Sequence, residues 1–186
     1  ASIILIAGML SGIPWCRKLL KPTRLLIVNI KIAMPLTIDL QIAVAKAQVP
    51  SREQFQRWAD AASAACRGDK KELTIRITDL VESEELNSRY RNKQGPTNVL
   101  SFPFDDPPGL TTNVLGDLVI CAPIVEAEAA QQYKTAEAHW AHILIHGVLH
   151  LCGYDHVDPD EAEQMETLET NILAGLGYPP PYAEEL

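Results

Sequence analysis

Five histidines fall within eighteen consecutive residues, and the chain has no others: His139, His142, His146, His150 and His156. His146 and His150 are four residues apart, so on a helix their side chains leave the same face and can reach one metal ion. His142 would lie about 12 Å along that helix from His150, whereas metal–imidazole bonds are about 2 Å long. A third ligand therefore requires the chain to turn back.

Gly153 is the residue that permits this turn. Glycine favours the left-handed backbone that ends helices, and here it follows a helical pattern over residues 135–151. The chain beyond Gly153 can then bring His156 to the ion held by His146 and His150. Three imidazoles leave the fourth position of a zinc ion open for water, as in catalytic sites. The spacing therefore predicts a hydrolase with one Zn²⁺ per chain.

The remaining polar residues of this window have simpler explanations. We expect His139 and His142 to be ordinary hydrogen-bonded residues, and Cys152 to be a small buried thiol at the helix end. Asp155 either orients an imidazole ring by accepting its N–H or is a solvated loop carboxylate. The sequence alone leaves both roles of Asp155 open.

Composition limits what such a site can serve. With 186 residues, 47% of them hydrophobic and 22% charged, the chain has the proportions of one globular domain. The net charge of −8 argues against general electrostatic binding of nucleic acid, so we expect no DNA partner and only a local site for a polyanion. The cysteines lie far apart without a C-x-x-C pair, which indicates a reducing, cytoplasmic setting: Cys16, Cys66, Cys121 and Cys152.

Hydrophobic periodicity predicts an α+β fold, with a small mixed sheet packed against helices. Alternating apolar residues predict extended segments at 37–42, 73–77, 97–102 and 115–121. Helical spacing predicts helices from Ser51 to Gly68, over 81–91, from Pro123, over 135–151, and over 159–174. The residues expected on the buried sides of the second and last helices are Leu86 and Tyr90, and Met165, Leu168 and Ile172.

The domain boundaries follow from the ends of this pattern. Residues 1–33 are expected to form an N-terminal extension outside the folded domain. The apolar stretch within them, 3–13, has no preceding basic residues and is too short to span a bilayer, so no membrane partner is expected. A single metallohydrolase domain is predicted over 34–182 and a loose tail over 183–186. The proline-rich stretch from Tyr178 is expected to be loose as well.

Two known families share the histidine spacing. The metzincin peptidases have the pattern H-E-x-x-H-x-x-G-x-x-H, but their general-base glutamate is replaced here by Gly147, which cannot transfer a proton. Residues 146–156 instead match the hallmark H-G-x-L-H-L-x-G-Y-D-H of the YbeY family of bacterial endoribonucleases at every fixed position. Further matches lie at Tyr90-Arg91, 97–104, 115–120 and 161–169. The chain therefore resembles a YbeY endoribonuclease over 34–182.

This resemblance implies a fold, a site and an activity. The fold is zincin-like α+β, with the metal site on a late helix and the following turn and one zinc ion on the three histidines. The activity is hydrolysis of single-stranded RNA in maturation of the 3' end of 16S ribosomal RNA and in ribosome quality control. The implied partners are rRNA, the ribosome and small-subunit assembly proteins.

The family's arginine falls on Arg91, and a guanidinium can clamp a phosphate and stabilise developing charge. Arg91 and His146 are accordingly the predicted catalytic residues. Arg89 lies beside Arg91 in a small basic patch that could equally be a solvated helix face.

The remaining candidates either serve the site or have structural roles. Asn98 and Ser101 line an RNA groove or make turn hydrogen bonds, and Asp117 aids catalysis or neutralises Arg91.

Two alternatives to the ribonuclease remain open from the sequence. A zinc-dependent, metallopeptidase-like hydrolase would cleave peptides and gain rate from Gly147→Glu. A non-enzymatic ribosome-assembly factor would use zinc only for folding, so His150→Ala would unfold it. The general base is not assigned, and either water or the 2'-OH of the RNA could attack the phosphate.

Overall fold

The computed structural model describes residues 35–45, 47–66 and 68–182. Within these ranges the strands are β1 (Thr37–Ile42), β2 (Glu72–Thr78), β3 (Val99–Pro103) and β4 (Val114–Cys121). The helices are α1 (Arg52–Ser63), α2 (Leu80–Arg91), α3 (Ala122–Gln131), α4 (Ala136–Leu151) and α5 (Pro159–Leu176). No helix in the described ranges is long and apolar enough to cross a membrane. The predicted extension at 1–33 and tail at 183–186 lie outside these residues.

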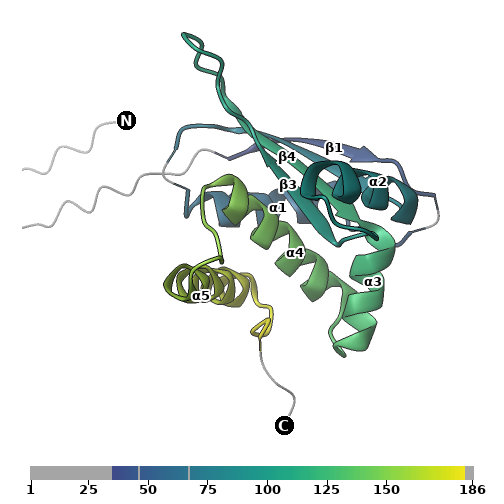
Figure 1. Cartoon of the computed structure of the whole chain (residues 1–186). Helices are drawn as coiled ribbons and strands as arrows, with labels where there is room; N and C mark the ends of the chain where they lie inside the picture. The colour runs from purple at the N-terminus through teal and green to yellow at the C-terminus, as the bar shows by residue number, and fades with distance from the viewer. Residues whose placement is uncertain (1–34, 46, 67, 183–186) are drawn as a thin grey trace, which may run out of the picture. The chain divides into compact units, whose positions relative to one another are not determined.

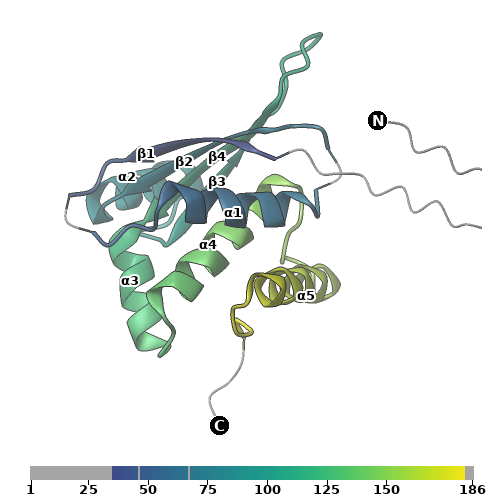
Figure 2. The ribbon, with the colours of Figure 1, turned by 180° about the vertical axis from the view of Figure 1, so that it is seen from behind.

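The four strands form one mixed sheet, which confirms the predicted α+β fold. Their order is β1-β2-β4-β3, with β1, β2 and β4 parallel and β3 antiparallel to β4. Helices α1 and α4 cover one face of the sheet, and α2 lies against the other (Figures 1 and 2). The face that α1 and α4 cover is apolar, because alternate residues of β2 and β4 point to it. They include Ile75, Ile77, Leu118 and Ile120.

Helix α4 is the central helix and carries four of the five histidines, His146 and His150 among them. It packs against α1, α3 and α5 as well as against β3 and β4. Gly147 allows the close approach to the sheet, because a Cβ atom there would lie 2.9 Å from Cδ2 of Leu118. The Ser101 hydroxyl also donates to the Gly147 carbonyl, at 3.3 Å. The sheet thus fixes the helix on which His146 and His150 stand.

Side-chain caps begin four of the helices, including α2, where the side chain of Asp79 accepts from the amide of Glu82. Ser51 and Gln54 form the capping box of α1, and the side chains of Thr135 and Asp158 cap α4 and α5. Helix α1 ends at Ser63, earlier than the predicted stop at Gly68. The chain leaves the helix there through short-range turns, in which the amides of residues 65 and 66 bond to the carbonyls three residues before them.

The predicted buried side of α2 is wrong. Its buried residues are Ser83 and Asn87, whereas Leu86 is half-buried and Tyr90 is 60% exposed. Ser83 bonds to both the amide and the carbonyl of Thr97, and the Asn87 amide donates to the Gly95 carbonyl at 2.8 Å. Helix α2 therefore uses a polar stripe to hold the loop that leads into β3.

The prediction of a free, reduced thiol at Cys152 is also wrong. Cys152 is disulfide-bonded to Cys66, with their Cα atoms 5.2 Å apart, and Cys121 is a buried free cysteine. The bond joins the segment after α1 to the C-terminal end of α4. Spacing in the sequence could not indicate this pair because 86 residues separate the two cysteines.

The proline-rich stretch from Tyr178 to Tyr182 packs against the domain instead of being loose. The Tyr178 hydroxyl accepts from the Trp58 indole at 3.0 Å and donates to Glu137 at 2.5 Å. The Tyr182 hydroxyl donates to the carboxylate of Glu169 on α5. Two tyrosines thus tie this segment to α1, α4 and α5.

Candidate metal centre

The structure brings His146, His150 and His156 together at the C-terminal end of α4. Gly153 takes a φ of 88°, which ends the helix and turns the chain back toward it. One ring nitrogen from each histidine lies within 4.8 Å of the others. The Nε2 atoms of His146 and His150 are 3.1 Å apart.

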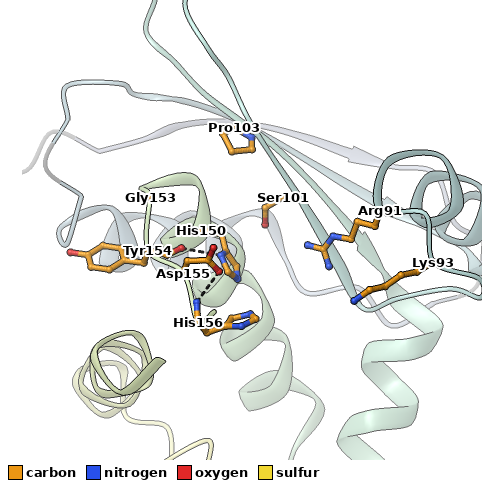
Figure 3. A pocket seen from close by; sticks show the side chains of 9 residues that line it. All are labelled: Arg91, Lys93, Ser101, Pro103, His150, Gly153, Tyr154, Asp155 and His156. Atoms are coloured by element: carbon orange, nitrogen blue, oxygen red, sulfur yellow. Dashed lines mark hydrogen bonds between the residues drawn. The ribbon is translucent and has the colours of Figure 1, made fainter. Parts of the chain in front are cut away.

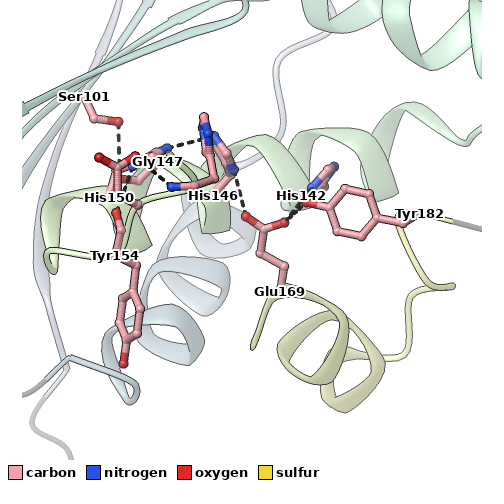
Figure 4. Close-up of polar contacts among 10 residues, drawn as sticks. Ser101, His142, His146, Gly147, His150, Tyr154, Glu169 and Tyr182 are labelled. Carbon is pink, nitrogen blue, oxygen red and sulfur yellow. Dashed lines mark hydrogen bonds and ion pairs between the residues drawn. The ribbon is translucent and has the colours of Figure 1, made fainter. Parts of the chain in front are cut away.

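Hydrogen bonds on the opposite ring nitrogens orient two of these histidines (Figure 4). Nδ1 of His150 lies 3.0 Å from the Tyr154 carbonyl, and Nδ1 of His146 lies 2.7 Å from Oε1 of Glu169. A carbonyl and an ionised carboxylate only accept hydrogen bonds, so each Nδ1 carries the proton and each Nε2 presents a lone pair.

This donor set fits a metal ion. Two lone pairs 3.1 Å apart repel each other unless a positive charge lies between them. Two nitrogens of a tetrahedral zinc site, with bonds of about 2.0–2.1 Å, lie about 3.3 Å apart. Burial, followed by the neighbouring charges of His146 and His156, lowers the pKa of His150 and favours the neutral imidazole that metals bind.

Glu169 is the site residue that the sequence analysis missed. It lies on α5, is fully buried, and accepts hydrogen bonds from His142, His146 and Tyr182. Burial opposes ionisation, but the three hydrogen bonds outweigh it and lower the pKa of Glu169 to about 2. A signal was present in the sequence: Glu169 lies on one helical stripe with buried Met165 and Leu173, where an apolar residue is expected.

An open cavity of about 530 Å³ adjoins the histidines. Its lining includes Arg91, Lys93 and Ser101 on one side, and His150 and His156 on the other. Figure 3 shows Arg91 and Lys93 reaching from the end of α2 toward the histidines. Positively charged side chains and potential metal ligands therefore face one cavity in a chain whose net charge is −8.

The family model for Endoribonuclease YbeY matches residues 39–177. The chain belongs to this family. It is a metal-dependent endoribonuclease of rRNA processing, and thus a hydrolase with RNA as its substrate, as the YbeY match establishes. The chain is also similar to the protein TM1509 from Thermotoga maritima, whose solution structure aligns at 21% identity and a TM-score of 0.49. That alignment covers 80% of this chain and 100% of the other.

In this YbeY chain, three sequence candidates lie away from the histidine cavity. Arg89 lines a separate hollow along α2. Asp117 lines a second cavity, between α2 and the face of the sheet that α2 covers, and no ion pair joins it to Arg91 within the described ranges. Asn98 bonds through its amide to Glu128 of α3, at 3.2 Å to either oxygen, a contact between distant parts of the chain.

Two further candidates, Asp155 and Ser101, line the histidine cavity. Their hydrogen bonds differ from those that the sequence suggested. Asp155 accepts from the amide N–H of His156 at 2.7 Å instead of from an imidazole ring. The Ser101 hydroxyl is engaged with the Gly147 carbonyl at the cavity wall. Glu169 makes the carboxylate–imidazole bond that the sequence suggested for Asp155.

Proposed function

We propose that this YbeY-family chain is a zinc-dependent endoribonuclease that cuts single-stranded RNA at the 3' end of precursor 16S ribosomal RNA. It would act in the cytoplasm, in ribosome quality control, with the ribosome or small-subunit assembly proteins as partners. The observation that carries the proposal is the cavity that has convergent imidazoles on one side and Arg91 and Lys93 on the other.

We assign His146, His150 and His156 as the zinc ligands. A zinc ion held there supplies a Lewis acid for the phosphate and lowers the pKa of nearby water. Arg91 donates hydrogen bonds to the phosphate oxygens and stabilises the charge that develops on them. Lys93 adds a second positive charge for the RNA backbone.

The size of the cavity supports a single-stranded substrate. Its volume of about 530 Å³ is in the range of pockets that hold small organic ligands, so it has room for an unpaired nucleotide. An unpaired nucleotide can enter and present its phosphate to Arg91, whereas the bases of an A-form duplex are stacked and paired. Duplex RNA is therefore expected to be a poor substrate.

Cleavage of a single-stranded RNA that spans the 3' end of precursor 16S rRNA tests this function. Zinc-loaded wild type is compared with His150→Ala, Arg91→Ala and the matched control Arg89→Ala, whose side chain lines a different hollow. We expect the first two variants to lose on the order of 100-fold or more in rate and Arg89→Ala to cut as the wild type does. A chelator should abolish cleavage and added zinc restore it.

Three outcomes would contradict the proposal. Equal cutting by all four proteins would indicate a contaminating nuclease. Unfolding of His150→Ala, detected by circular dichroism, together with uncut RNA would favour an assembly factor with structural zinc. Equal cutting of the duplex would remove single-strand specificity. The product ends also identify the nucleophile, because attack by the 2'-OH leaves a 2',3'-cyclic phosphate and attack by water does not.

A further inference from the structure

Helix α5 buries a carboxylate beside the proposed metal site. The side chain of Glu169 is 0% exposed, although it lies on the same stripe as the apolar residues Met165 and Leu173. A buried carboxylate is unfavourable unless hydrogen-bond donors surround it. Three donors do so here, from α4 and from the segment after α5 (Figure 4).

The two oxygens of Glu169 have different partners. Oε2 accepts from Nε2 of His142, at 3.1 Å, and from the Tyr182 hydroxyl. Oε1 is 2.7 Å from Nδ1 of His146. His142 and Tyr182 therefore fix the carboxylate group through one oxygen, and the other oxygen is directed to His146.

The bond to Glu169 determines what His146 presents to the cavity. The two nitrogens of an imidazole lie on opposite sides of the ring, so holding Nδ1–H toward α5 turns Nε2 toward Nε2 of His150, 3.1 Å away. A carboxylate acceptor also makes the imidazole a more basic ligand and adds a negative charge near a bound cation. His150 receives only a neutral carbonyl acceptor at Nδ1, that of Tyr154.

We propose that Glu169 is a positioning residue of the metal centre, held by His142 and Tyr182, which orients His146 with Nε2 toward the ion. The inference rests on the proposed role of His146 as a ligand. Glu169 acts through His146 and touches neither the ion nor the RNA.

The zinc affinity of the full chain, measured by competition with a chromogenic chelator, tests the inference. Glu169→Gln keeps the shape of the side chain and removes its charge. Glu163→Gln makes the same change at an exposed position of α5 and is the matched control. We expect zinc binding to weaken 10- to 100-fold in Glu169→Gln and to stay unchanged in Glu163→Gln. Equal affinity of a folded Glu169→Gln and the wild type would overturn the inference.

A second measurement uses the wild type alone, in case Glu169→Gln does not fold. In zinc-loaded protein labelled with ¹⁵N-histidine, NMR should find the metal on Nε2 of His146. The Nδ1 proton should exchange slowly with water and resonate far downfield. The inference is wrong if the ion is on Nδ1, or if the Nδ1 proton exchanges as fast as that of a free imidazole.

One further variant separates this inference from the proposed function. If His146→Ala binds zinc as tightly as the wild type, the proposed ligand set is wrong and the role of Glu169 is overturned with it. If zinc affinity depends on both His146 and Glu169 but RNA is not cut, the inference about Glu169 is supported and the ribonuclease proposal fails.

Discussion

Residue 147 shows how little space separates α4 from the sheet. A Cβ atom there would meet Leu118 at 2.9 Å and Val99 at 3.3 Å, and both side chains are buried. A side chain at position 147 would therefore point into the core and away from the cavity. The glutamate that metzincin peptidases carry at this position could not serve as a base in this chain.

We expect Gly147→Glu to lower the free energy of unfolding by about 3 kcal/mol or more, because it inserts an unpaired carboxylate into a packed core. Gly175→Glu is the matched control, since Gly175 is an exposed glycine of α5 and a Cβ atom added there would meet nothing within 4 Å. Urea unfolding followed by circular dichroism measures both. Wild-type stability of Gly147→Glu, or peptide cleavage by it, would contradict this account of position 147.

Buried ionisable residues make the stability of the metal-free chain depend on pH. Burial lowers the pKa of His139 and His150 below the ordinary 6.5. Below that pH the unfolded chain therefore binds protons that the folded chain does not, and the free energy of unfolding falls. Glu169 acts in the same direction, because its pKa is lowered from 4.5 to about 2, so its contribution is lost as the pH falls through that range.

We therefore expect the urea midpoint of metal-free protein to decrease in two stages, the first below pH 6.5 and the second below pH 4.5. Glu169→Gln should retain the first stage and show a smaller second stage, because the carboxyl groups of Glu82 and Asp106, whose pKa values are also lowered, still contribute to it. A midpoint that stays constant between about pH 7 and about pH 5 would show that the two histidines have ordinary pKa values in the folded chain.

The sequence predicted which side chains meet at the site only where these residues are close together along the chain. His146 and His150 share one helix, and His156 follows it after a single turn, so spacing alone predicted that they meet. Glu169 comes from another helix, and only the packing of α5 on α4 brings it to His146. Spacing along the chain carries no information on such a contact.

Among the secondary-structure elements, the first residues of the capped helices and the strands with strict alternation were predicted best. The caps of α1, α4 and α5 depend on three or four neighbouring residues, which the sequence displays directly. The orientation of α2 was not predictable in this way. Periodicity assumes that apolar residues are buried, whereas α2 buries Ser83 and Asn87 to satisfy the backbone of the 95–97 loop.

Sheet order and the packing of the last segment depend on contacts between distant parts of the chain. The pairing of β2 with β4 passes over α2 and β3, and no local pattern specifies it. Tyr178 and Tyr182 stand among prolines, which suggested a loose segment. Their hydroxyl groups form hydrogen bonds with side chains of α1, α4 and α5, so the prediction of a loose segment is wrong for these residues.

At the scale of the whole molecule, the disulfide bond joins Cys66 and Cys152, which lie 86 residues apart in the sequence. A cross-link of this span restricts the unfolded chain, and the loop-entropy model gives a stabilisation of about 4.5 kcal/mol. We expect dithiothreitol to lower the free energy of unfolding of the oxidised protein by up to about that amount. Urea unfolding with and without the reductant measures the change.

Cys152→Ser provides the control for this prediction, because it cannot form the bond and should respond little to the reductant. Peptide mapping by mass spectrometry under non-reducing conditions should recover a linked pair that contains Cys66 and Cys152. If the pair is absent and wild-type stability is the same in both conditions, the two cysteines are separate thiols. In a reducing compartment the bond would be open, so RNA cleavage should be assayed in both states.

The order of the site residues along the chain matters while the protein is being made. His146, His150 and His156 lie within eleven residues, and Glu169 and Tyr182 follow them. Translation therefore releases the proposed ligands first, and Glu169, the acceptor for His146, emerges 23 residues after His146. If Glu169 orients His146 as proposed, a nascent chain can take up the ion loosely and retain it firmly only once α5 has docked. Uptake of the metal and completion of the polypeptide are then linked in time.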